Sequence, residues 1–154
     1  MKTKINILSI DSGGVRNLIS AYIIQKIEEQ LQKNTKNPDL KIADVFDTFL
    51  STGSSTLLSY LYQIPSTTGS YKSSHEVLKA YLTATKRIYK RKHLSYLPYR
   101  TTYCAKQNLE QQIQHLFKHL ENVKNKKNNI VPLFNLSSGD LEVVNACTSE
   151  LSAE

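Results

Sequence analysis

Blocks of hydrophobic and polar positions along the chain predict short strands followed by helices. Residues 5–10, Ile-Asn-Ile-Leu-Ser-Ile, are rich in β-branched side chains and run into Asp-Ser-Gly-Gly at 11–14, which predicts a strand that ends in a tight turn. The next segment carries an apolar face at helical spacing, made by Leu18, Ile19, Tyr22, Ile23, Ile27 and Leu31. This spacing predicts an amphipathic helix with one side against a core.

The same order repeats once. The segment 41–50 leads into a second apolar strand at 45–50, and a Ser/Thr/Gly turn at 51–56 precedes a helix through Leu57, Leu58 and Leu61. Two strand–turn–helix units favour a parallel α/β sheet. Both turns would then lie at the carboxyl ends of strands, where α/β proteins place their sites.

The second half of the chain predicts two further helices and two further strands. A Ser/Thr/Gly linker precedes a helical pattern at 75–92, and a second helix runs through 109–120 into a polar loop. A third strand follows at 130–136, where Pro132 indicates a place near an edge or a bulge. Residues 141–146 begin a fourth element.

The composition is that of one folded domain. The chain has 154 residues, 40% of them hydrophobic and 21% charged, which leaves room for one domain and excludes two large ones. No apolar run approaches the roughly 20 residues of a membrane-spanning helix, and the N-terminal apolar stretch is too short for a signal peptide. We therefore expect a cytoplasmic protein, with signal-less export left open. Cys104 and Cys147 stand apart and are expected to be reduced thiols.

The net charge of +7 is concentrated in one segment. Residues 71–127 hold 13 Lys and Arg against 3 Glu, whereas the remainder holds 7 against 10 Asp and Glu. A basic segment interleaved with tyrosines could dock on an anionic membrane or on nucleic acid, or could simply be a solvated face. No recognised nucleic-acid module accompanies it, so we expect no specific nucleic-acid partner.

The first candidate for chemistry is the turn at 11–17. Gly13 and Gly14 let backbone N–H groups converge, the helix that follows presents its positive end, and Val15 and Arg16 complete the turn. Such a turn can hold an anion or a developing oxyanion. It is neither a Walker loop nor an intact G-x-G-x-x-G motif.

The second candidate is the turn that follows Phe46-Asp-Thr-Phe-Leu. A sharp strand-to-helix turn of small residues is how an α/β hydrolase exposes its serine, usually as G-x-S-x-G. The run Gly53-Ser54-Ser55-Thr56-Leu57 begins that pattern and then places a leucine where the second small residue belongs.

Together the two turns resemble those of the patatin-like phospholipases. That family pairs a D-G-G-G-x-R-G oxyanion loop with an F-D-x-x-x-G-T-S-T-G-G elbow, and 7–19 is similar to the first motif, with Ser12 and Asn17 in place of glycines. The likeness continues at 99–109, 130–136 and 144–149, so it covers nearly the whole chain. It implies a three-layer α/β fold with a mainly parallel sheet, here as a single partial domain over 1–154 that is truncated at its C-terminus.

The resemblance also implies a chemistry, hydrolysis of lipid acyl esters by a Ser–Asp dyad without a cofactor. Aligned without gaps, the nucleophile position falls on Gly53, which has no side chain to attack an ester. Rescue by Ser54 or Ser55 would need the turn to slip, because an elbow places its hydroxyl through one backbone geometry. The family's dyad aspartate, in a D-G-[GA] motif, has no counterpart. We therefore expect an inactive homologue.

No other residue is well placed as a base or metal ligand. Asp140 does not correspond to the dyad aspartate, and Asp44 and Asp47 are expected to cap or pair locally. His115 and His119 share a helical face without a third ligand, which favours solvated or packed histidines over a metal site. We expect no metal.

Three readings remain open beside the inactive homologue. The segment 71–127 could make the chain an anionic-membrane binding module, since each lysine near such a surface contributes about 1 kcal/mol. Nonspecific nucleic-acid binding is the second. The third is a chain that does not fold stably, because a truncated sheet leaves an unpaired edge. Phospholipid or a membrane surface is the expected partner, and the oligomeric state stays undetermined.

Overall fold

The computed structural model describes residues 4–64, 70–89, 106–117 and 127–145. The N-terminal half contains β1 (Ile7–Ile10), a 3-10 turn (Gly14–Arg16), α1 (Asn17–Thr35), α2 (Ile42–Val45), β2 (Thr48–Ser51) and α3 (Ser55–Gln63). The second half contains α4 (Ser74–Ile88), α5 (Lys106–Phe117), β3 (Asn128–Phe134) and β4 (Leu141–Asn145). The alternation of strands and helices that the sequence predicts is therefore present.

The four strands form one mixed sheet in the order β1-β2-β3-β4. The first three are parallel, with Ile10 opposite Ser51 and Leu50 opposite Ile130, and β4 runs antiparallel to β3. The mainly parallel α/β sheet predicted from the sequence is confirmed. Because β1 and β2 are parallel neighbours, the turns that follow them lie side by side.

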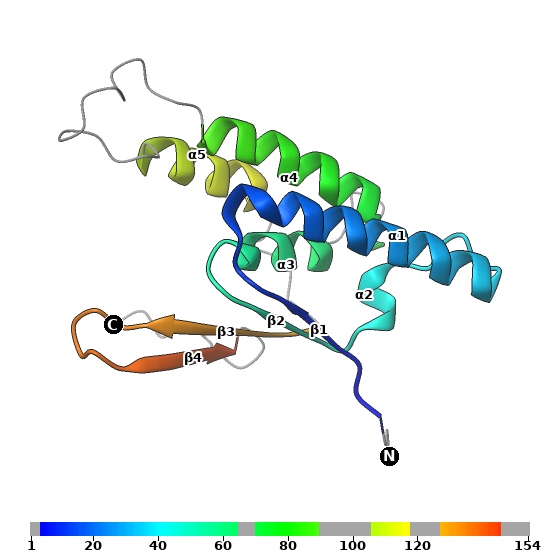
Figure 1. Ribbon diagram of the computed structural model, residues 1–154, viewed down its shortest axis with the longest axis horizontal. Helices are drawn as coiled ribbons and strands as arrows, with labels where there is room; N and C mark the ends of the chain where they lie inside the picture. Colours follow the sequence, from blue (N-terminus) through cyan, green and yellow to red (C-terminus); the bar gives the residue numbers. More distant parts are fainter. Residues whose placement is uncertain (1–3, 65–69, 90–105, 118–126, 146–154) are drawn as a thin grey trace.

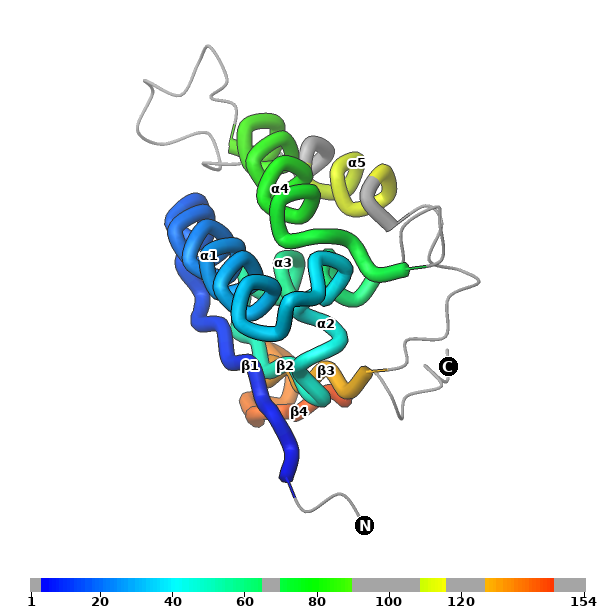
Figure 2. The backbone as a smooth tube through the Cα atoms, turned by 90° about the vertical axis from the view of Figure 1, so that its right-hand side faces the viewer, coloured from blue at the N-terminus to red at the C-terminus, as the bar shows by residue number. Residues whose placement is uncertain are grey.

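The helices all lie on one face of the sheet, as Figures 1 and 2 show. The core forms between them and the sheet, where Phe49, Leu58 and Tyr62 are fully buried. The described residues thus supply two layers of the expected three. The opposite face of the sheet carries exposed apolar side chains, among them Ile7, Leu141 and Val143.

The segment before β2 is a helical turn rather than the start of a strand. The strand predicted at 45–50 begins only at Thr48, and α2 occupies Ile42–Val45. Two carboxylates stabilise this turn, since Glu28 accepts from the backbone N–H of Ile42 at 2.9 Å and Asp44 accepts from that of Lys41 at 2.9 Å. Hydrogen bonds to the first amides favour a helix start over an extended strand.

Pro132 lies in an interior strand, but at a place where a proline is tolerated. β3 pairs with β2 only over 128–130, and beyond that point it pairs with β4 alone, with Pro132 opposite Val143. Because Pro132 lies past the end of the β2 ladder, the missing N–H leaves no acceptor of β2 unpaired. The predicted fourth element is confirmed as β4.

Several predictions concern residues outside the described ranges. These are the end of the helix predicted to Lys92, the tyrosines 96, 99 and 103, His93 and His119, both cysteines, most of the loop 121–129, and the motif-like stretches at 99–105 and 146–149. Within the described part of the chain, no helix is long and apolar enough to span a bilayer.

Candidate functional site

The two predicted turns meet at one end of the sheet and are joined by hydrogen bonds. The N–H of Ser12 donates to Thr52 Oγ1 at 2.9 Å, and the N–H of Gly14 donates to Ser54 Oγ at 2.8 Å. The hydroxyl of Ser55 lies 2.6 Å from the carbonyl oxygen of Ile10. The structure therefore brings Gly14 of the glycine loop together with Ser54 of the elbow, from two segments about 40 positions apart, whereas Val15 and Arg16 are exposed and make no hydrogen bond to the described residues of the elbow.

Gly53 stands at the apex of the turn between β2 and α3. Its φ of +53° lies in the left-handed region, which glycine adopts without the steric cost that a Cβ imposes. The neighbours of Gly53 are in ordinary conformations, with Ser54 at φ −68° as the N-terminal flank of α3. The turn is therefore as sharp as the elbow pattern predicts, with glycine at its most restricted position.

The two serines beyond Gly53 are both engaged in hydrogen bonds. Ser55 is fully buried, and its hydroxyl accepts from the N–H of Thr52 at 3.0 Å while facing the carbonyl oxygens of Ile10 and Thr52. Ser54 Oγ receives the N–H of Gly14 and lies 3.4 Å from Asn17 Nδ2. Ser55 ties the turn to β1, whereas Ser54 ties it to the glycine loop.

The glycine loop has the compact form that its sequence predicts. Gly14 has φ +56° and opens the 3-10 turn Gly14–Arg16. A Cβ on Gly13 would collide with Oδ1 of the buried Asn17. Val15 is about half exposed. Since the N–H of Gly14 already donates to Ser54 Oγ, this N–H is not available to a ligand unless Ser54 moves.

A hydroxyl from α4 supports the loop from the helix side. Tyr81 OH donates to the carbonyl oxygen of Gly14 at 3.0 Å. Burial raises the pKa of Tyr81, so the phenol stays protonated and remains a donor at neutral pH. The sequence placed Tyr81 on the apolar face of the helix but gave no sign of this contact.

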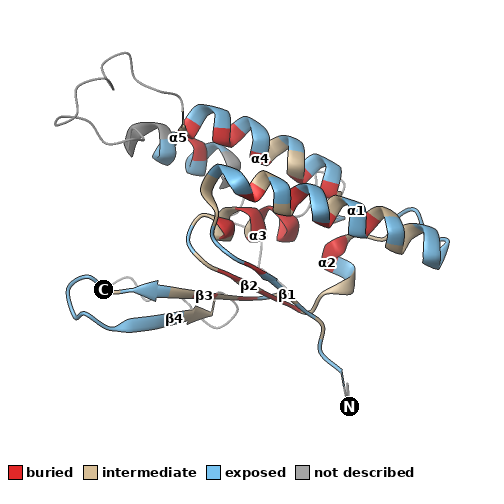
Figure 3. Cartoon of the chain, viewed as in Figure 1, coloured by how far each residue is buried: buried red, intermediate tan, exposed pale blue. Residues whose placement is uncertain are grey.

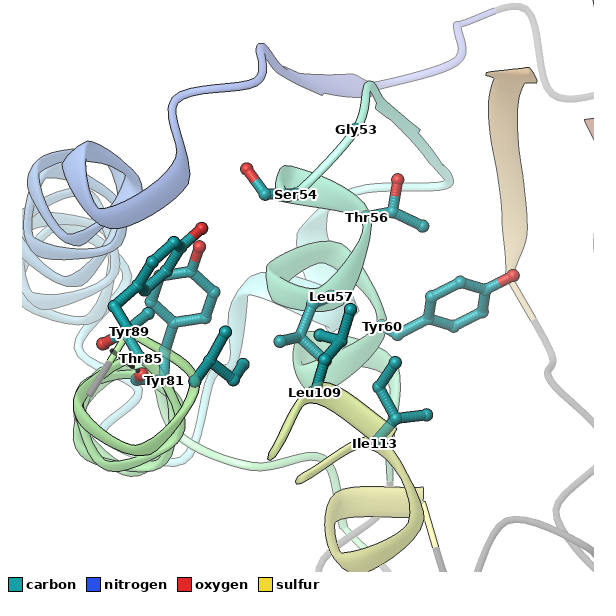
Figure 4. A pocket seen from close by; sticks show the side chains of 11 residues that line it. Gly53, Ser54, Thr56, Leu57, Tyr60, Tyr81, Thr85, Tyr89, Leu109 and Ile113 are labelled. Atoms are coloured by element: carbon teal, nitrogen blue, oxygen red, sulfur yellow. Dashed lines mark hydrogen bonds between the residues drawn. The ribbon is translucent and has the colours of Figure 1, made fainter. Parts of the chain in front are cut away.

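An apolar cavity of about 540 Å³ opens beside the elbow (Figure 4). Gly53 and Ser54 stand at one end of it, and three helices form its walls. Figure 4 shows the side chains around this space. They are Leu57 and Tyr60 of α3, Tyr81 of α4 and Tyr89 just after it, and Leu109 and Ile113 of α5. Its volume is within the range of small-molecule sites. Sequence periodicity placed Leu57, Leu109 and Ile113 on helices but did not predict a cavity between them.

The acidic candidates lie away from the elbow. Asp47 Oδ2 accepts from the N–H of Asn6 at 3.0 Å, which joins the amino ends of β2 and β1. Asp44 caps α2. Asp44 acts locally, as predicted, whereas Asp47 joins two strands that are 41 positions apart in the sequence. Asp140 lies in the turn between β3 and β4.

Metal-binding side chains do not gather in the part of the chain that the structure covers. Over residues 4–64, 70–89, 106–117 and 127–145, no three His, Cys, Asp or Glu side chains lie close enough to hold an ion. His115 is exposed on α5.

The fold and the paired turns define the class of protein: an α/β protein with a glycine loop after β1 and a sharp elbow after β2. No family model matches the chain. The chain is 39% identical over 61 residues to the potato (Solanum tuberosum) protein named "Probable inactive patatin-3-Kuras 1" and, over the same length, to patatin-17 of Solanum cardiophyllum. It is 37% identical over 65 residues to patatin group A-3 of Solanum tuberosum.

These alignments cover 40–42% of this chain and 16–17% of the patatins. The chain therefore matches about a sixth of the length of these curated relatives. Over that part it is similar to these patatins, which agrees with the motif resemblance there but not with its extension over nearly the whole chain.

Proposed function

We propose that this chain is a patatin-like protein that binds the acyl chain of a lipid without hydrolysing it. The observation that carries the proposal is the apolar cavity that opens at Gly53, where the elbow motif of the family has its serine. A cavity of about 540 Å³ lined by aliphatic and aromatic side chains suits an alkyl chain.

The state of the elbow supports the absence of hydrolysis. Nucleophilic catalysis needs an oxygen at the elbow apex and a base beside it. Gly53 supplies no oxygen, Ser55 is buried against the carbonyl of Ile10, and Ser54 is hydrogen-bonded to the loop. Asp47, just before β2, and Asp44 of α2 accept hydrogen bonds from the backbone amides of Asn6 and Lys41.

The first test of this proposal is intact mass after exposure to a fluorophosphonate, which marks activated serines. We expect no adduct on the full chain. A single adduct at Ser54 or Ser55 would overturn the non-hydrolytic proposal, because it would mean that the turn presents one of them as a nucleophile.

The second test measures acyl binding with a fluorescent fatty acid. Ile113→Glu places a charge in the cavity wall, and Ile27→Glu changes a similarly exposed isoleucine of α1 as the matched control. We expect Ile113→Glu to weaken binding at least tenfold and Ile27→Glu to leave it unchanged. Equal effects, or no binding by the unmodified chain, would contradict an acyl site in this cavity.

Docking on anionic lipid is a second candidate function, favoured by the exposed basic side chains of α4. Lys79, Lys86 and Arg87 are exposed on α4, and Lys79, Arg87 and His115 line a groove between α4 and α5. Several cations near an anionic surface give salt-sensitive binding.

Vesicles that contain phosphatidylserine test this second function by co-sedimentation over a salt series. Changing Lys79 and Lys86 to Gln should reduce pelleting several-fold, and the same change at the exposed Lys33 of α1 and at Lys36, which follows α1, is the charge-matched control. Equal losses in both variants would indicate net charge alone, and no pelleting at low salt would remove the idea.

A further inference from the structure

The side chain of Ser12 lies beside the elbow apex, at the place that a side chain on Gly53 would need. A Cβ built on Gly53 would lie 2.7 Å from Ser12 Oγ and 3.2 Å from Ser12 Cβ. The first distance is shorter than real Cβ contacts, and the second is tighter than most. Although the two positions are 41 residues apart in the sequence, the side chain of Ser12 fills the space next to Gly53 that a side chain at position 53 would occupy.

The backbone of Ser12 is fixed against the elbow, and its exposed hydroxyl has one contact there among the described residues. The N–H of Ser12 donates to Thr52 Oγ1 at 2.9 Å, which fixes its backbone against the elbow. Ser12 Oγ lies 3.4 Å from Ser54 Oγ. Ser54 Oγ in turn accepts a hydrogen bond from the N–H of Gly14. Rotation of the Ser12 hydroxyl away from Gly53 gives up its contact with Ser54, whereas Ser12 Cβ, which the backbone fixes, stays 3.2 Å from a Cβ on Gly53.

Both positions depart from the motif that the chain otherwise resembles. The motif has glycine where this chain has Ser12, and serine where this chain has Gly53. In the structure the two departures face each other. In the motif the elbow carries the side chain and the glycine loop leaves room for it. In this chain the loop carries the side chain, Ser12, and the elbow leaves room for it at Gly53.

We propose that Ser12 occupies the nucleophile's place at the elbow, so that Ser12 and Gly53 form a sterically exchanged pair. The inference rests on the proposed function in taking Gly53 as the nucleophile position. Two features then keep a nucleophile out of the elbow. Position 53 has no hydroxyl, and Ser12 occupies the space that such a hydroxyl would need. A serine at position 53 fits only when Ser12 gives way.

A double-mutant cycle of thermal unfolding on the full chain tests the pair. Gly53→Ser adds the overlap with Ser12 to the cost of a positive φ, and we expect Tm to fall by roughly 5–10 °C. Adding Ser12→Gly should recover about half of that loss. Ser12→Ala, which removes Oγ but keeps Cβ, should recover less than Ser12→Gly.

Gly139 supplies the matched control. It also has a positive φ, +77°, but a Cβ there would meet nothing within 4 Å. Gly139→Ser therefore reports the backbone cost alone, and we expect a Tm loss of roughly 3 °C that Ser12→Gly does not recover. With Ser12→Gly in place, the cost of Gly53→Ser should approach that of Gly139→Ser.

Additive losses for Ser12→Gly with Gly53→Ser would overturn the exchanged pair. If Gly53→Ser does not fold, Gly53→Ala gives the same comparison, because its Cβ meets the same Ser12 atoms. These outcomes are independent of the fluorophosphonate test. An adduct on the unmodified chain would contradict the non-hydrolytic proposal, whereas additivity would contradict only the pair.

Discussion

The two faces of the sheet differ in how completely they are covered. On the helix side Phe49 is fully buried and Ile10 and Val131 nearly so, and the buried Glu28 is hydrogen-bonded to Ser74. On the other face, and along the β3–β4 hairpin, apolar side chains stay exposed. Figure 3 shows buried positions gathered between helices and sheet, and exposed ones along the hairpin.

This difference locates the stability of the chain in its helix-facing half. Burial of apolar surface drives folding, so residues that are exposed in the described structure contribute little to it. The cavity belongs to the covered side, and the elbow at the end of the sheet is anchored to it through the buried Ser55. The site is therefore built on the part of the molecule that packs.

The largest difference in unfolding free energy between the two faces is expected when a phenylalanine is removed from each of them. Phe49 is 0% exposed and Phe134 is 61% exposed. We expect Phe49→Ala to cost about 4 kcal/mol of unfolding free energy and Phe134→Ala about 0.5 kcal/mol. Urea denaturation measures both. Similar costs would mean that the hairpin face is buried in solution, against a second surface.

A second prediction concerns the buried carboxylate of the helix side. Glu28 accepts from the N–H groups of Ile42 and Ser74 and from the Ser74 hydroxyl, at 2.8–2.9 Å. Glu28→Ala leaves two amides at helix starts without a partner, so we expect a loss of about 3 kcal/mol.

The exposed Glu29 is the control for this prediction. It pairs with Lys26 at 2.7 Å on the helix surface, where solvent screens the pair, so Glu29→Ala should cost much less than Glu28→Ala. Urea denaturation measures the unfolding free energy of both variants. An equal loss in Glu29→Ala and Glu28→Ala would contradict the role of Glu28 in connecting α1 to α2 and α4.

A smaller effect is expected at the start of α4. The backbone N–H of Ser73 donates to Glu76, which lowers the pKa of that carboxyl, and Ser73 Oγ accepts from the N–H of Glu76 in return. Ser73→Ala should cost about 1 kcal/mol. Because the folded pKa of Glu76 is depressed, its contribution is present above the ordinary pKa near 4.5 and is lost as the pH falls through the folded value.

Stability measured between pH 7 and pH 3 checks this dependence. Glu76→Gln should flatten the acid limb of the curve, whereas a Gln at the exposed Glu142 of the hairpin should leave it in place. An unchanged acid limb in Glu76→Gln would show that other carboxyls carry the pH dependence.

The smallest effect is expected on the uncovered face itself. Val143 is 63% exposed on β4, so Val143→Lys should change the unfolding free energy by no more than about 0.5 kcal/mol. It should also reduce self-association, because it interrupts an apolar surface. Urea denaturation measures the unfolding free energy, and light scattering measures self-association. A loss above about 1.5 kcal/mol would indicate that this face is covered.

Much of the fold followed from the sequence because its signals are local. The period of apolar positions placed α1, α3 and α4 within a few residues, and the turn residues marked the ends of β1 and β2. The exception was 42–45, where the pattern indicated an approach to a strand. There a carboxylate from α1 stabilises a helical turn, and no local pattern reports a partner 14 positions away.

The motifs also predicted which residues make up the candidate site. The resemblance placed Gly13, Gly14 and Arg16 in one loop and Gly53 in the nucleophile position, since those assignments depend only on residue type and spacing. Parallel pairing of β1 and β2 then made their turns neighbours.

Tertiary structure alone decided how those residues face one another. Only the packed chain places Ser54 on the N–H of Gly14, Ser12 in the space beside Gly53, and α5 as a wall of the cavity. Steric exclusion and hydrogen bonding act over a few ångströms between atoms that the sequence separates by about 40 residues. The sequence determined which side chains are available, and the packing of the two turns determined which of them fills the elbow.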